Sequence, residues 1–112
     1  MKRKYNITPT VEGLIDFIKR DYNGWAGQTP YGNDRPEREF PVEVDAGSKY
    51  LKVVTQRNKH GFGGSCWGFI DRKTGDIYKA ASWRAPAKHA RGNLNDINTW
   101  KDFKWTGPQY LL

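Results

Sequence analysis

The chain has 112 residues, and 19 Lys and Arg against 12 Asp and Glu give it a formal net charge of +7 at pH 7. A chain of this length is expected to form one domain with one core, and its positive charge favours polyanionic partners, nucleic acid first and acidic proteins second. A single cysteine excludes an internal disulfide and suits a reducing cytosol, while no apolar run forms a signal peptide or approaches the ~20 residues of a membrane span.

Residues 9–22 carry the pattern of an amphipathic helix. Thr8 can cap it, and Pro9 can occupy its first position, where a missing amide hydrogen costs nothing. Apolar side chains then recur at helical spacing, at Val11, Leu14, Ile15, Ile18 and Tyr22. Asn23-Gly24 supplies a left-handed stop, so we expect the helix to end there.

Residues 24–38 are rich in glycine, proline and polar side chains, a composition that favours a loop. We expect Trp25 and Tyr31 within it to cover the edge of the core, the commoner position of an aromatic side chain in a long loop. Exposure of both rings is the alternative.

After this loop the apolar residues recur with a period of two, which indicates β-strands. Four strands are predicted, at about residues 39–45, 49–57, 65–71 and 76–81. Between the middle two, Gly61-Phe62-Gly63-Gly64 lacks the Lys and Ser/Thr of a phosphate-binding loop, and we interpret it as a flexible connection.

The Asp-Arg-Lys-Thr-Gly-Asp stretch between the last two strands has the composition of a four-residue hairpin turn. Such a turn sets Ile70 opposite Ile77 and Phe69 opposite Tyr78, whereas a three-residue loop would shift this register. By alternation Trp67 shares the face of Phe69, which makes that face an aromatic row. The row either packs as core, the commoner outcome, or stays exposed and stacks nucleic-acid bases.

A basic, tryptophan-bearing segment follows at residues 83–93. Its charges are too close together to be buried without several partners, so we predict a surface loop. Arg and Lys beside Trp suit phosphate contacts next to base stacking, and other cations of the hairpin can add to them. The predicted nucleic-acid contacts are Trp83, Arg84, Lys88, His89, Arg91, Arg72, Lys73 and Lys79. The alternative is a solvated loop that Trp83 anchors to the core.

Residues 94–103 place apolar side chains at helical spacing, but their asparagines and threonine are poor helix formers. We predict a short helix there, followed by an irregular tail.

Catalytic and metal sites have little support in the sequence. Cys66 could pair with His60 or His89 as nucleophile and base, but no third orienting group is indicated, so a buried structural cysteine is favoured. Two histidines and one cysteine at distant positions lack the paired spacing of zinc ligands. We therefore predict no enzyme activity, no cofactor and no metal.

The string from Thr74 to Asn93, TGDIYKAASWRAPAKHARGN, resembles a segment of small, uncharacterised bacteriophage proteins, and the likeness extends over about residues 50–95. The resemblance implies a phage origin, and with it a location in the host cytoplasm. It transfers no catalytic residue, and it favours small phage roles such as handling nucleic acid or blocking a host protein.

Together these patterns predict a single α+β domain, in which an N-terminal helix packs on a three- to four-stranded antiparallel sheet. A basic loop and a largely irregular C-terminal region complete it. The predicted function is non-catalytic nucleic-acid binding. The alternative is a protein-interaction module, either a host-protein inhibitor or a small virion component, and a small hydrolase or nuclease would need Asp, Glu or His side chains that converge in a pocket.

Overall fold

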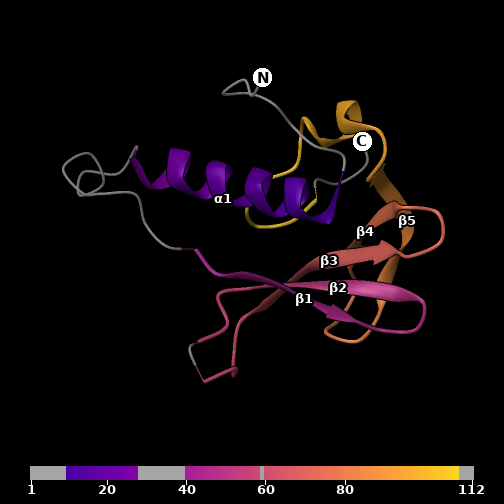
Figure 1. Cartoon of the computed structure of the whole chain (residues 1–112), viewed down its shortest axis with the longest axis horizontal. Coiled ribbons are helices and arrows are strands. Elements are labelled where there is room, and N and C mark those ends of the chain that lie inside the picture. The colour runs from indigo at the N-terminus through magenta and orange to yellow at the C-terminus, as the bar shows by residue number, and fades with distance from the viewer. Residues whose placement is uncertain (1–9, 28–39, 59, 109–112) are drawn as a thin grey trace.

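A computed structural model of the chain describes residues 10–27, 40–58 and 60–108. These residues form one α-helix and one five-stranded antiparallel sheet, so the predicted α+β class is confirmed. The helix lies across one face of the sheet, and the segment that follows the last strand returns to the same side (Figure 1).

The helix, α1, spans Val11–Gly27. Its first turn is capped by Thr10, whose Oγ1 accepts a hydrogen bond from the Gly13 amide at 3.1 Å. The predicted cap and first position, Thr8 and Pro9, lie outside the described residues. The predicted stop at Asn23-Gly24 is wrong. Asn23 Nδ2 instead donates to the carbonyl of Lys19 at 3.0 Å, and the helix continues for another turn.

The sheet has the strand order β1-β2-β3-β4-β5, so every strand pairs with its neighbour in the sequence. The strands are β1 (Val42–Ala46), β2 (Tyr50–Thr55), β3 (Ser65–Asp71), β4 (Asp76–Ala80) and β5 (Pro86–Asn93). The predicted count of three to four strands is therefore too low. The fifth strand occupies most of the segment that was predicted to be a basic loop.

The strand β5 escapes prediction because its residues neither alternate nor resemble a central strand. Pro86 is its first residue, where a missing amide donor is tolerated at the edge of a sheet. Ile77 pairs with Gly92 but the next residue, Tyr78, pairs with Ala90, so the register shifts between them. A second shift follows between Tyr78 and Ala80, which pairs with Pro86. These irregularities remove the period of two by which a strand is recognised.

The hairpin of β3 and β4 has the predicted register, with Phe69 opposite Tyr78 and Ile70 opposite Ile77. Ile70 and Ile77 are buried in the core that the helix covers. Phe69 and Tyr78 point to the other face, which we call the second face of the sheet.

The turn of this hairpin is held by Asp71. Its Oδ1 accepts hydrogen bonds from the amides of Lys73 at 2.8 Å and Thr74 at 3.1 Å, and these amides lower the pKa of the Asp71 carboxyl. Gly75 completes the turn at a φ of 83°.

Trp67 does not share the face of Phe69, so this part of the prediction is wrong. Val53 pairs with Gly68, whereas the next residue of β2, Val54, pairs with Cys66, which leaves Trp67 as an extra residue in β3. A bulge of this kind breaks the alternation and turns the indole to the core side of the sheet.

The bulged indole is anchored by the C-terminal segment. Its ring lies 5.6 Å from that of Phe103, and its Nε1 donates to the carbonyl of Lys104 at 2.8 Å. The predicted aromatic row is thus divided between two faces. Trp67 and Phe69 are both buried, at 2% and 3% exposure, while Tyr78 is half-buried.

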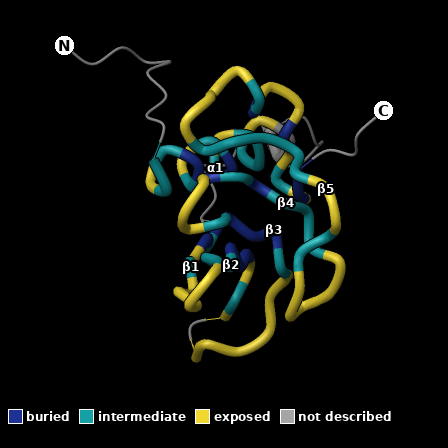
Figure 2. Tube along the Cα trace, turned by 90° about the vertical axis from the view of Figure 1, so that its right-hand side faces the viewer, coloured by how far each residue is buried: buried dark blue, intermediate teal, exposed yellow. Residues whose placement is uncertain are grey.

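The core lies between the helix, the sheet and the C-terminal segment, and Figure 2 shows buried stretches in the central strands with exposed loops around them. Its buried side chains come from all three parts of the molecule. They are Leu14, Ile18, Phe40, Val42, Val53, Trp67, Ile70, Ile77, Trp100 and Phe103.

The predicted helix at residues 94–103 is reduced to one 3₁₀ turn, η1, at Ile97–Trp100. Asp96 caps this turn and Thr99 bonds back to the Asp96 carbonyl, the local bonding that makes such residues poor helix formers. Further along, the amide of Trp105 donates to Asp21 Oδ2 at 2.7 Å, which joins the C-terminal segment to α1.

Candidate nucleic-acid interface

A pocket of about 340 Å³ opens on the second face of the sheet. It lies between the β1–β2 turn, the middle of strands β2 and β3, and the β4–β5 connection. Its walls are formed by Asp45, Ala46, Gly47, Ser48, Lys49, Tyr50, Lys52, Phe69 and Arg84, and we call it the second-face pocket.

The aromatic part of this pocket comes from adjacent strands. Phe69 is buried, and its ring meets that of Tyr50 edge to face at 5.9 Å between centroids. Tyr50 also meets Tyr78 at 6.1 Å and 83°. Edge-to-face contacts of this kind fix ring positions, so this side of the pocket is preorganised.

One wall of the pocket is the β1–β2 turn, which Arg72 holds in place. The Arg72 guanidinium donates through Nη1 to the carbonyl of Gly47 at 2.6 Å, and the backbone amide of Arg72 donates to the carbonyl of Lys49 at 3.0 Å. Arg72 was predicted to contact phosphate. Here its guanidinium braces a pocket wall from outside.

The opposite wall is the β4–β5 connection, which folds back over the second face. The amides of Ala81 and Ser82 both donate to the carbonyl of Ala85, so the connection is a closed turn. At its tip, the Trp83 ring lies 4.5 Å from Lys52 Nζ, a cation–π contact that ties the tip to β2. Trp83 nevertheless keeps 44% of its surface exposed.

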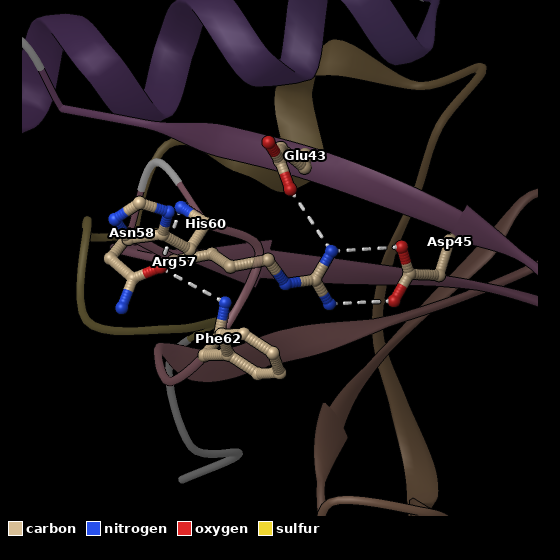
Figure 3. A network of polar contacts seen from close by, with 6 residues as sticks. All are labelled: Glu43, Asp45, Arg57, Asn58, His60 and Phe62. Atoms are coloured by element: carbon tan, nitrogen blue, oxygen red, sulfur yellow. Dashed lines mark hydrogen bonds and ion pairs between the residues drawn. The ribbon is translucent and has the colours of Figure 1, made fainter.

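Arg57 offsets the negative charge at the pocket. Asp45 is the acidic residue of the lining, and its carboxylate accepts two bonds from Arg57, at 2.7 and 3.1 Å. The same guanidinium bonds Glu43 at 3.0 Å (Figure 3). The bonds from Arg57 hold the pKa of Asp45 below its usual range, so the carboxylate stays ionised and paired. Three cations of the lining, Lys49, Lys52 and Arg84, then dominate the charge of the pocket.

The predicted contact residues do not all meet at one place. Arg84 lines the pocket, and its neighbour Trp83, at the tip of the β4–β5 turn, contacts Lys52 of the lining. The other predicted contacts are Lys88, His89 and Arg91 on β5, Lys79 on β4, and Arg72 and Lys73 in the β3–β4 turn, and none of them lines the pocket. Lys88 and His89 are exposed, whereas Arg91 and Lys79 are half-buried.

Lys49, Tyr50 and Lys52 are among the pocket residues that were not predicted from the sequence. These three belong to the predicted second strand or its start, and Tyr50 and Lys52 alternate there with apolar Leu51 and Val53. This alternation was a usable signal, because it assigns the tyrosine and the lysine to the face away from the core.

The residues weighed as a catalytic pair are not assembled into a site. Cys66 is on β3 and His89 on β5, with β4 between them, and His60 is exposed in the β2–β3 loop. The Cys66 Sγ lies 3.8 Å from the carbonyl of Gly68, and burial raises the pKa of the thiol. Among the described residues, no group of three or more His, Cys, Asp and Glu could hold a metal ion. Trp25 and Tyr31, predicted to cover the core edge, fall where side chains are not described.

Comparison with known proteins identifies a family of unknown function. In the part of the chain that the structure describes, no helix is long and apolar enough to cross a membrane. No curated protein matches the chain, and no solved structure does. One family of unknown function, DUF7717, matches residues 1–111, and the chain belongs to this family.

Proposed function

We propose that this protein binds nucleic acid without catalysing a reaction, and that the second-face pocket with Trp83 at its rim is the contact site. The observation that carries the proposal is the folding of the β4–β5 turn onto Lys52. It brings an exposed indole onto Lys52, one of the three cations of a pocket that also has an aromatic wall. Proteins that bind single strands combine these same features, a basic groove for phosphates and aromatic rings for bases.

Charge supports this choice of partner. The formal net charge of +7 attracts polyanions at a distance, and the acidic side chain at the pocket is already paired with Arg57. Lys88 and His89 on β5 and Lys73 in the β3–β4 turn are exposed. In this proposal they contact phosphates outside the pocket, positioning the strand without reading its sequence.

The resemblance of residues 74–93 to phage proteins adds a setting. We propose that the protein is of phage origin and acts in the host cytoplasm, where nucleic acid is its abundant polyanionic partner.

Titration of labelled single- and double-stranded oligonucleotides by fluorescence anisotropy at low salt tests the proposal. Replacing Trp83 with alanine removes one stacking ring, which is worth about 1–3 kcal/mol, so affinity for the bound form should fall about 5- to 150-fold. The matched control is Lys101→Ala, because Lys101 is exposed beside η1 and lies outside the pocket. Affinity should also fall with salt, with a log–log slope of about −0.7 for each phosphate contacted on a single strand. Failure of both oligonucleotides to bind would refute the proposal.

A second function, protein interaction, is favoured by the β2–β3 loop. Phe62 is 71% exposed there, and Asn58 Oδ1 accepts hydrogen bonds from the amides of His60 at 2.9 Å and Phe62 at 3.1 Å (Figure 3). An exposed ring whose own amide is bonded in this way suits a partner with an apolar pocket. Under this alternative, Phe62→Ser abolishes binding to a purified host protein and leaves oligonucleotide affinity unchanged.

A further inference from the structure

We infer that the second-face pocket takes a single nucleotide unit, a phosphate joined to an unpaired base, and that the protein therefore prefers unpaired nucleotides to duplex. This inference rests on the proposed function, because it names the ligand of the same site. Size is the first argument. Ligand pockets begin at about 300 Å³, and the second-face pocket, at about 340 Å³, lies near that lower limit. It has room for one small ligand and none for several stacked nucleotides.

The lining has a cationic part and an aromatic part, which match the phosphate and the base of a nucleotide. Lys49, Lys52 and Arg84 supply positive charge for a phosphate, and the half-buried ring of Tyr50, which packs on the buried ring of Phe69, supplies apolar surface for a base. Inorganic phosphate would leave the aromatic part unused. A neutral aromatic ligand would leave the cations without a partner.

The Lys52–Trp83 contact links the two halves. The Lys52 ammonium lies 4.5 Å from the centre of the indole ring, so a phosphate that reaches Lys52 is held beside Trp83. The base attached to that phosphate can then contact an aromatic ring without leaving the pocket. Lys52 is half-buried on β2, whereas Lys73 and Lys88 are exposed. A phosphate must enter the pocket to meet Lys52 but can meet the other two from outside.

Duplex fits this shape poorly. Reading a major groove requires a projecting helix or two-stranded ribbon, and the β4–β5 ribbon instead folds its tip against β2. In a duplex the bases are stacked and paired, so they cannot reach Tyr50 unless a nucleotide is turned out of the helix. A free mononucleotide and a nucleotide of a single strand share the required chemistry.

Competition measurements separate these sources. A labelled single-stranded oligonucleotide is first bound to the full chain, and one unlabelled competitor is then added in each titration. The competitors are the single strand, a duplex of equal length, a nucleoside 5′-monophosphate, the matching nucleoside and inorganic phosphate. We expect the monophosphate to displace the strand at lower concentration than the nucleoside or phosphate does, and single strand to bind about tenfold or more tightly than duplex.

Lys52→Ala should weaken monophosphate and single-strand binding about tenfold or more, because a charge-assisted contact is lost. Lys101→Ala is the control, because it removes the same charge at a site outside the pocket. Lys52→Gln also removes the charge at Lys52 but keeps a longer side chain than alanine. Circular dichroism checks that each variant folds. Equal affinity for single strand and duplex, no displacement by the monophosphate, or equal effects of Lys52→Ala and Lys101→Ala would overturn the inference and leave the proposed function standing. Binding of the monophosphate but of no oligonucleotide would uphold the pocket and refute the proposed function, and binding of neither would refute both.

Discussion

At the residue scale, Asn93 connects three parts of the chain. Its side-chain Nδ2 donates to the carbonyl of Thr74 at 3.1 Å and to Asp76 Oδ1 at 2.9 Å, while its Oδ1 accepts from the Asn95 amide at 2.8 Å. Its backbone carbonyl accepts from Trp100 Nε1 at 2.9 Å. The sequence groups Asn93 with the basic surface segment, but its role in the structure is to hold the β3–β4 turn, β5 and η1 together.

Replacing Asn93 with alanine should therefore destabilise the protein. Its amide group makes three hydrogen bonds, of which the one to Asp76 is partly buried, and losing them should cost about 1–3 kcal/mol. Urea denaturation measures the change in the free energy of unfolding. Asn98→Ala is the control, because Asn98 is exposed and its bond to Asp96 comes from the backbone amide. Equal midpoints for the two variants would contradict this role.

The Asp45–Arg57 pair makes stability depend on pH in a defined direction. Because hydrogen bonding to Arg57 lowers the pKa of Asp45, the folded state binds this proton less readily than the unfolded state does. The pair therefore stabilises the fold above the ordinary aspartate pKa of about 3.9, and that contribution is lost as the pH falls through the lowered value.

The predicted measurement is the difference in urea midpoint between the wild type and Asp45→Asn. It should be largest near neutral pH and should shrink towards zero as the pH is taken below about 3.9. Asp16→Asn, on the exposed side of α1, controls for the change in net charge. A difference that is constant over this pH range would show that the pair contributes nothing through ionisation.

At the element scale, the sequence predicts what is local and fails where one element depends on another. The β3–β4 hairpin is predicted in register because its turn lies within the six residues that specify it. The side of Trp67 depends on a bulge against β2, which no local pattern reveals. The strand at residues 86–93 begins with proline and contains two shifts in register, so only its partner β4 defines it as a strand.

Close packing of the C-terminal segment on β5 requires a glycine at position 92. A Cβ there would lie 2.7 Å from Thr99 Oγ1 and 2.8 Å from Phe103 Cζ. Gly92→Ala should push the segment off the strand and lower stability by about 1–3 kcal/mol, the usual effect of overpacking. Gly24→Ala is the matched control. Its Cβ meets nothing within 4 Å in α1, so it should raise stability by about 0.5–1 kcal/mol. Thermal unfolding of both variants checks the opposite signs, and a loss of stability in both would contradict this account.

At the scale of the whole molecule, the residues that stabilise the fold and the residues of the proposed binding site lie on opposite faces of the sheet. Ile77 is fully buried on the helix side, while Lys52 is on the second face. Ile77→Ala should lower the free energy of unfolding by about 2–5 kcal/mol and leave oligonucleotide affinity unchanged in the folded protein. Lys52→Ala should weaken binding with little change in stability. Calorimetry and anisotropy on the same two variants check this, and a variant that changes both properties would show that the faces are coupled.

The pocket itself could be predicted only in part. Trp83 and Arg84 stand out in the sequence because a tryptophan beside basic residues is costly to bury. Their closeness to Lys49 and Lys52, more than thirty positions earlier in the sequence, follows from the pairing of four strands and the fold-back of the β4–β5 turn. Such long-range proximity has no local signature, so the sequence identifies one wall of the pocket and misses the other.

The order of the strands also bears on how the chain folds during its synthesis. Each strand pairs with the one made just before it, so the loops to be closed are short and the entropy lost in closing them is small. The bond from the Trp105 amide to Asp21 instead spans 84 positions. The hairpins can therefore form while the chain is still leaving the ribosome, whereas the helix side of the core can be closed only after the segment that contains Trp105 has emerged. Until then, the apolar face of the sheet depends on the helix alone for cover.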